Sequence, residues 1–231
     1  MIEKVLDYER ELFFALNGSN CELLDRFMYL YSGKAVWIPV AIFIVIILLY
    51  KKDWRESLFI ILAIALVITL CDQFASGICK PLFTRYRPTH HPEFMDQVDT
   101  VFGYRGGRYG FISSHAANAF GFATFMVYFF RYALFSWIIY IWATLTAYSR
   151  IYLGVHFITD IIPGILSGIL FGYLVYQLYK WGRARALARY IIVAPSCIMY
   201  TQYQKRLVVL AISITIILVL VFNATLSPLL R

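Results

Sequence analysis

The chain has 231 residues, of which 61% are hydrophobic and only 15% are charged, and its net charge at pH 7 is +8. Soluble domains carry about 25% charged residues, so this composition excludes a disordered chain, a disulfide-stapled small domain and an ordinary soluble enzyme. It indicates a polytopic membrane protein with one domain over residues 1–231. In so apolar a chain, the positive charge favours anionic lipid headgroups or a phosphate as partners, and no nucleic acid.

The first 32 residues differ from the rest of the chain. Apolar side chains such as Leu12 and Phe13 alternate with charged ones such as Glu9 and Arg10, and a polar run at residues 17–20 divides the segment. This pattern predicts an amphipathic segment over residues 1–32 that lies in the membrane interface as two short pieces.

Long apolar segments follow. A membrane-spanning helix needs about 20 predominantly apolar residues, and its backbone polar groups must be bonded within the segment. We therefore expect an all-α protein with about six transmembrane helices, over residues 33–50, 57–79, 111–130, 132–148, 157–179 and 207–226.

Polar residues in these apolar surroundings gather in three clusters. The clusters run from Lys80 to Arg87-Pro88, over Ser113-Ser114-His115, and from Ser149-Arg150 through His156 to Asp160. The first two share one loop, and two predicted spans separate them from the third. All three are therefore expected on the same side of the membrane, where they can form one site.

The third cluster suits nucleophilic chemistry. His156 and Asp160 are four residues apart, so on a helix they share one face. The carboxylate can then hold one ring nitrogen and leave the other free to attack. Taken alone, the pair has an equally good structural explanation as a cap at a helix end.

The other two clusters suit a phosphate. Lys80, Arg87 and Arg150 supply positive charges that match phosphate oxygens, although each alone is also typical of an interfacial anchor. Ser113 and Ser114 lie at a predicted helix N-terminus, where serine caps the helix and free N–H groups favour an anion. Combined with His156, these groups predict an oxyanion cradle with His115 as the general acid.

Together the clusters resemble the signature of the type 2 phosphatidic acid phosphatase (PAP2) superfamily, over residues 72–168. That signature reads K-x6-R-P, then P-S-G-H, then S-R-x5-H-x3-D. The first and third parts match fully, and the second departs at Ile112 and Ser114, where proline and glycine are usual. The resemblance implies a six-helix membrane phosphatase that needs no metal or other cofactor.

The resemblance also implies a role for each residue of the signature. His156 would form a phosphohistidine, Asp160 would orient it, and His115 would protonate the leaving group. The phosphate would be held by Lys80, Arg87, Arg150, Ser113 and the backbone at Ser114. Arg85 lies outside the signature, and we interpret it as a contact behind the site or with a headgroup.

A site at the lipid surface favours a lipid phosphate as substrate. A lipid A phosphate or undecaprenyl diphosphate is our first expectation, and phosphatidylglycerol phosphate or phosphatidic acid is the alternative. Vanadate-dependent haloperoxidases share the anion-site pattern but are soluble, which argues against them here. A non-enzymatic lipid-phosphate transporter would not need the nucleophile. Residues 89–110 predict either a basic, aromatic lid over the headgroup or a disordered flap.

Basic residues indicate the orientation in the membrane, because cytoplasmic loops are enriched in them. They gather in residues 51–56, at Arg131 and in residues 180–206. The Lys/Arg counts of the two sides differ clearly only if Lys80, Arg87 and Arg150 are assigned to the substrate. With that assignment, we expect a multi-pass protein of the cytoplasmic membrane whose active site faces the periplasm. The oligomeric state stays open.

Overall fold

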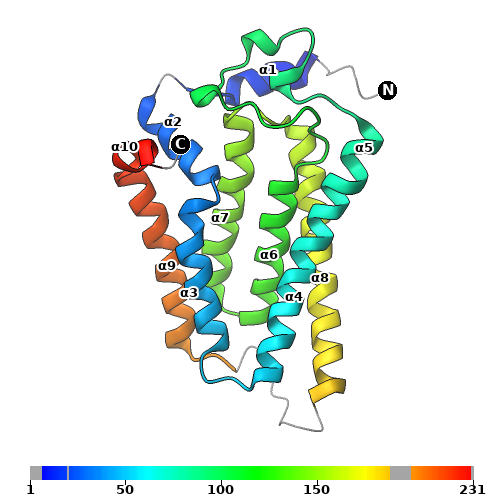
Figure 1. The fold of residues 1–231 in the computed structure, drawn as a ribbon, viewed down its shortest axis with the longest axis vertical. Coiled ribbons are helices and arrows are strands. Elements are labelled where there is room, and N and C mark those ends of the chain that lie inside the picture. The colour runs from blue at the N-terminus through cyan, green and yellow to red at the C-terminus, as the bar shows by residue number, and fades with distance from the viewer. Residues whose placement is uncertain (1–6, 20, 188–198, 230–231) are drawn as a thin grey trace.

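The protein is described here by a computed structural model, which covers residues 7–19, 21–187 and 199–229. In these ranges the chain forms helices and no β-strand. Most of the helices stand side by side as a bundle, and one short helix lies across an end of it (Figure 1).

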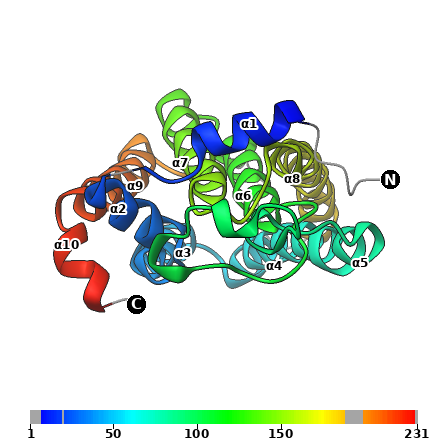
Figure 2. The ribbon, with the colours of Figure 1, turned by 90° about the horizontal axis from the view of Figure 1, so that it is seen from above.

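The predicted interfacial segment forms two helices, α1 (Asp7–Leu16) and α2 (Glu22–Ser32). Helix α1 lies across the ends of α7 (Ala133–Tyr152) and α8 (Ile158–Leu187), as the view from above shows (Figure 2). It is held there by Phe13, which is fully buried and packs edge-on against Phe157 with ring centroids 5.4 Å apart. Glu9, one helical turn earlier, is buried on the same face.

Each predicted apolar segment corresponds to a helix: α3 (Ile38–Leu49), α4 (Trp54–Asp72), α6 (Ser114–Phe130), α7, α8 and α9 (Gln202–Val221). Helix α4 continues through a π-helical segment (Gln73–Cys79) into α5 (Lys80–Phe83), which makes Trp54–Phe83 one rod of 30 residues.

Three helices of the described ranges are long and apolar enough to cross a membrane, Trp54–Phe83, Ile158–Leu187 and Gln202–Val221. A fourth crossing is possible if α2 and Ala35–Leu49, which meet at a bend of 67°, count as one broken span. The chain is therefore an all-α membrane protein, and the count of six crossings stays a prediction.

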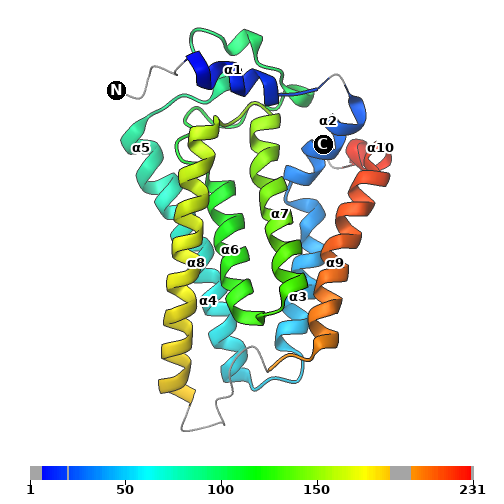
Figure 3. The same cartoon turned by 180° about the vertical axis from the view of Figure 1, so that it is seen from behind.

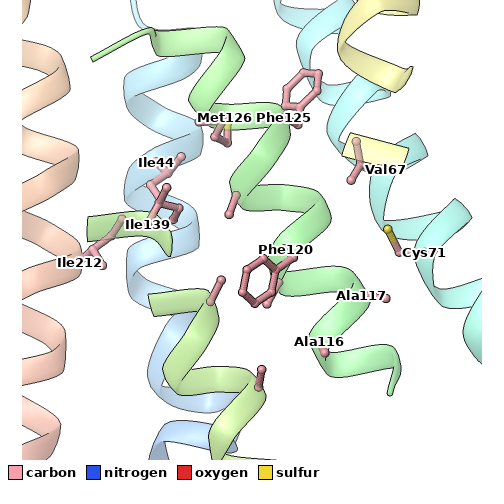
Figure 4. Packing of buried hydrophobic residues seen from close by; sticks show 14 of the residues in the cluster. Ile44, Val67, Cys71, Ala116, Ala117, Phe120, Phe125, Met126, Ile139 and Ile212 are labelled. Atoms are coloured by element: carbon pink, nitrogen blue, oxygen red, sulfur yellow. The ribbon is translucent and has the colours of Figure 1, made fainter. Parts of the chain in front are cut away.

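Helix α6 occupies the centre of the bundle, between α4, α7 and α8 (Figures 1 and 3). Its buried side chains include Phe120, Phe125 and Met126, and the close-up shows Val67 and Cys71 of α4 on one side of α6 and α7 on the other (Figure 4). Burying such side chains fixes α6 as the element against which the others are positioned.

Helices α6 and α8 approach closely because glycine lies at their contact. A Cβ atom on Gly168 of α8 would lie 2.4 Å from the carbonyl oxygen of Ala117 of α6, which no side chain permits. The close approach aligns the first turns of the two helices, and the N–H of Ser113 donates to the carbonyl of Asp160 at 3.0 Å. The second and third polar clusters therefore meet.

Helix α7 ends because Gly154 adopts a φ of 71°, in the left-handed region that favours glycine. A Cβ there would also lie 2.6 Å from Cγ1 of Val98. His156 consequently lies in the short connection between α7 and α8.

The basic stretch at residues 180–206 begins at the far end of α8, opposite the end that α1 covers (Figures 1 and 3). Residues 188–198 of this stretch, like residues 1–6 of the interfacial segment, lie outside the described residues.

Candidate active site

His156 and Asp160 contact each other at the start of α8. Nδ1 of His156 lies 3.3 Å from Oδ2 of Asp160, and the same oxygen accepts the backbone N–H of Phe157 at 3.0 Å. We predicted the pair on one face of a helix, and this is wrong in detail, because His156 precedes α8 and Asp160 reaches back across the first turn. Since a carboxylate only accepts hydrogen bonds, the contact places the proton on Nδ1.

The other ring nitrogen of His156 is left available. Within the residues that the structure covers, Nε2 is buried and has no hydrogen-bond partner. The backbone N–H of His156 donates to the carbonyl of Arg150 at 3.2 Å, which fixes the backbone of His156 against the end of α7. Buried polar atoms usually have partners, and an exception of this kind is typical of a reactive group.

Cations surround His156. Burial and then the charges of Arg87, Arg150, Lys80 and Arg85 lower the pKa of His156 well below its ordinary value of 6.5. The imidazole is therefore neutral at physiological pH, which is the form that can act as a nucleophile. The cations that hold it neutral are also the groups expected to bind a phosphate.

Lys80 begins α5, directly after the π-helical segment. Its Nζ donates to the hydroxyls of Ser76 at 3.0 Å and Ser114 at 3.3 Å, and Ser76 in turn donates to Asp72 at 3.5 Å. π-Helical segments often mark functional sites. The Ser114 hydroxyl, at a signature position where glycine is usual, thus lies beside a predicted phosphate ligand.

Arg87 is fixed by the chain that follows it. Its backbone N–H donates to the carbonyl of Arg108 at 3.0 Å, and its Nε donates to the carbonyl of Tyr109 at 3.1 Å. Burial and the charge of Arg150 lower the pKa of Arg87 to about 10, so the guanidinium stays charged at neutral pH.

Arg150, in the last turn of α7, donates from Nη2 to the hydroxyl of Tyr104 at 3.0 Å and from Nη1 to Ser32 of α2. Burial raises the pKa of Tyr104, but the charge and hydrogen bond of Arg150 outweigh this and lower it below 10. Tyr104 belongs to residues 89–110, whose Val98 and Val101 are buried. This loop is therefore packed onto the site, and its contact with a headgroup stays a prediction.

Ser113 caps α6 as predicted, because its hydroxyl accepts the N–H of Ala116 at 3.4 Å. His115 follows in the first turn, within electrostatic range of Arg150 and His156. It lines a cavity of about 350 Å³ between α3, α4 and α6, together with Ser114. Further walls of this cavity are apolar, including Trp37, Ile38, Ala41, Ile68 and Phe122.

Arg85 joins two carboxylates. Its Nη1 donates to Oδ1 of Asp160 and its Nη2 donates to Oε2 of Glu9, both at 2.8 Å. Its guanidinium also lies 4.6 Å from the ring centroid of Phe157 and is buried. Of our two interpretations of Arg85, the geometry favours the contact behind the site.

Glu9 and its second partner Thr159 were not predicted as part of the site. Glu9 is one of several acidic residues on an amphipathic helix, and nothing in its charge distinguishes it. A signal was available in its spacing, because Glu9 is four residues from the apolar Phe13 and therefore shares the face that packs inward.

Fold and site together define a membrane-embedded phosphatase with a histidine at its centre. The profile described as the PAP2 superfamily matches residues 57–184. The chain therefore belongs to the PAP2 superfamily, and it is a phosphoric ester hydrolase.

Several known proteins are similar to the chain. A lipid A 4′-phosphatase of Porphyromonas gingivalis is 47% identical over 197 residues, which cover 85% of this chain and 84% of that protein. A lipid A 4′-phosphatase of Bacteroides thetaiotaomicron is 40% identical over 178 residues, covering 76% and 79%. The crystal structure of Aquifex aeolicus LpxE matches with a TM-score of 0.55 and 28% identity, and covers 77% of this chain and 99% of LpxE.

Proposed function

We propose that the chain is a lipid A 4′-phosphatase that acts through a phosphohistidine on His156. The observation that carries the proposal is the buried Nε2 of His156, which has no partner in the described part of the chain while Asp160 holds Nδ1. The identities of 47% and 40% to two lipid A 4′-phosphatases support the choice of substrate.

In the first step, Nε2 of His156 attacks the phosphorus atom. The new N–P bond forms as the P–O bond to the sugar breaks, and the electron pair of that bond goes to the leaving oxygen. His115 enters this step as the imidazolium, a form that the bound phosphate anion favours by offsetting the nearby cations, and it protonates this oxygen, which avoids an alkoxide. Asp160 stabilises the positive charge that develops on the ring of His156.

In the second step, a water molecule attacks the phosphohistidine. His115, now neutral, accepts a proton from this water, and the N–P bond breaks to release inorganic phosphate and restore His156. Lys80, Arg87 and Arg150 neutralise the phosphoryl oxygens in both steps, so that charge stabilisation comes from side chains and no metal ion is needed.

A lipid substrate is supported by the cavity beside His115. Its apolar walls between α3, α4 and α6 suit acyl chains, while Ser114 and Asp72 provide a polar end. The basic stretch that begins at the far end of α8 supports an active site on the periplasmic side of the cytoplasmic membrane.

The test is phosphate release by the purified protein in detergent micelles. Lipid A should be dephosphorylated faster than undecaprenyl diphosphate, phosphatidylglycerol phosphate or phosphatidic acid. Tandem mass spectrometry of the product should show loss of the phosphate on the distal glucosamine, with the 1-phosphate retained. Loss of the 1-phosphate, or a preference for another lipid of the panel, would contradict the assignment.

A further inference from the structure

We propose that Glu9 and Arg85 are positioning residues for His156 and Asp160, which makes the amphipathic helix α1 part of the active site. The inference rests on the proposed function, since it assigns His156 as the nucleophile. The contacts form a continuous chain from α1 to that nucleophile. Glu9 binds Arg85 at 2.8 Å, Arg85 binds Asp160 at 2.8 Å, and Asp160 lies 3.3 Å from His156.

The carboxylate of Glu9 is built into the protein. It is buried, and its Oε1 accepts both the backbone N–H of Thr159, at 3.2 Å, and the hydroxyl of that residue. Thr159 lies in the first turn of α8, where backbone N–H groups have no partner within the helix. Glu9 therefore caps the helix that carries Asp160. A residue that merely anchored α1 in the interface would keep its charge in water, as the exposed Glu11 does.

Arg85 divides its guanidinium between the two carboxylates. One Nη atom faces Glu9 and the other faces Asp160, and only the rigid fork of arginine reaches two acceptors in this way. The two carboxylates together balance the charge of Arg85. Without Glu9, the full charge of Arg85 would act on Asp160 and draw its electron density away from His156.

The chain of contacts sets the electrostatic environment of His156. Charged or titratable groups act on this ring from the elements packed around it: Lys80 of α5, Arg85 and Arg87 of the following loop, His115 of α6, Arg150 of α7 and Asp160 of α8. Glu9 of α1 lies one contact further away, on the other side of Arg85. Cations outnumber carboxylates in this set. Removing the negative charge of Glu9 therefore makes the imidazole less basic, and a less basic imidazole is a weaker nucleophile.

The test compares Glu9→Gln with Glu11→Gln, a matched change at an exposed position of the same helix. Glutamine keeps the shape of Glu9 and an oxygen that can accept the N–H of Thr159, but its NH2 group cannot accept from Arg85, so the variant removes the ion pair with Arg85. We expect kcat for lipid A to fall about 10-fold to 100-fold in Glu9→Gln, the range seen when partners that orient metal-binding imidazoles are lost. Glu11→Gln should behave as the wild type.

Two further readouts separate positioning from a structural role. KM and the inhibition constant of inorganic phosphate, which binds without a bond to His156, should stay within about twofold of the wild type, because Lys80, Arg87 and Arg150 are unchanged. The acid limb of kcat/KM should move to lower pH, because the imidazole has become less basic. A merely loosened fold would weaken the binding of inorganic phosphate and leave the acid limb in place.

A second variant, Arg85→Lys, carries the test if Glu9→Gln does not fold, as judged by thermal unfolding and size-exclusion chromatography in detergent. Lysine keeps the positive charge but loses the fork, so kcat should fall while the acid limb stays in place. The inference is overturned if kcat of Glu9→Gln stays within about twofold of the wild type, or if only KM changes.

The inference and the proposed function can fail separately. Wild-type protein that releases no phosphate from lipid A contradicts the proposed substrate. The effect of Glu9→Gln on kcat would then be measured with whichever phosphate ester of the panel the wild type does hydrolyse.

Discussion

His156 is distinguished from the three other histidines by the contact that leaves its Nε2 available. We predict that His156→Ala abolishes turnover while the protein folds normally, because loss of covalent catalysis costs several orders of magnitude. The measurement is phosphate release from lipid A at substrate saturation. His90→Ala, in the loop after Arg87, is the matched control and should retain activity. A His156→Ala protein that keeps more than about a tenth of wild-type activity would exclude the nucleophilic role.

The pH dependence should reflect the lowered pKa of His156. The protonated ring cannot attack phosphorus, so activity is lost as the pH falls through this pKa. Because burial and the surrounding cations place the pKa well below 6.5, the acid limb of kcat/KM should lie below pH 6.5. A pH profile of kcat/KM in a series of overlapping buffers measures it. An acid limb above pH 6.5 would show that His156 does not titrate in this way.

The cations at the site predict the response to inhibitors. Lys80, Arg87 and Arg150 supply the charge that metal ions supply in many other phosphoryl-transfer enzymes. EDTA should therefore leave activity unchanged, and vanadate should inhibit because it resembles five-coordinate phosphorus. Initial rates with each compound provide the measurement. Strong inhibition by EDTA that added Mg²⁺ reverses would contradict the proposed mechanism.

Among the elements, α6 and α8 position the catalytic residues through their glycine contact. Gly168→Ala places a methyl group against the backbone of α6, and overpacking of this kind costs roughly 1–3 kcal/mol. We predict a lower unfolding temperature in detergent. We also predict a reduced kcat, because the methyl group displaces α8 and thereby moves Asp160 away from Ser113. Gly107→Ala is the control, since a Cβ there would have no neighbour within 4 Å. Equal unfolding temperatures of the two variants would contradict the role of this contact.

The helices themselves were largely predictable from the sequence, because apolar runs fix where they lie. The residues at which the helices end were less predictable. Helix α7 continues to Tyr152, beyond the predicted residue 148, since Ser149 and Arg150 remain helical until Gly154 reverses the chain. Helix α8 extends to Leu187, beyond residue 179, because polar and charged residues continue the helix at its far end.

Helix α6 shows why the number of spans did not follow from apolarity. It has 17 residues, about 25 Å of helix, and packs on three neighbouring helices. Because a spanning helix needs about 20 residues, α6 is not among the three helices of the described ranges that are long and apolar enough to cross a membrane.

For the molecule as a whole, the proposed orientation in the membrane can be tested by labelling single cysteines. The native cysteines Cys21, Cys71, Cys79 and Cys197 would first be replaced. We predict that Asp96→Cys, in the loop after Arg87, reacts with an impermeant maleimide in intact spheroplasts. Ala186→Cys, at the far end of α8, should react only after the membrane is opened. The physical reason is the basic stretch at that end, which marks the cytoplasmic side.

The reverse labelling pattern would place the dephosphorylated lipid in the cytoplasmic leaflet. Labelling of both positions without opening the membrane would indicate leaky cells. As a control, both positions should be labelled once the membrane is opened, which shows that both cysteines can react.

The three polar clusters could be assigned to one side of the membrane from the sequence, because two spans separate the third from the others. The structure brings them together at the end covered by α1. What could not be predicted is that α1 itself joins them. Its contact with Thr159 is 150 residues away in the chain, and no periodicity reports a pairing at that distance.

That separation has a consequence for biosynthesis. The ribosome makes Glu9 150 residues before its partner Thr159, so the carboxylate can bind the first turn of α8 only after the helices between them have been synthesised. Until then α1 lies at the membrane surface with the carboxylate of Glu9 in water, a position that the other acidic residues of α1 favour. On this account the site has its full set of contacts only when α8 is in place, and a nascent chain that has stalled before α8 cannot yet hydrolyse the lipids around it.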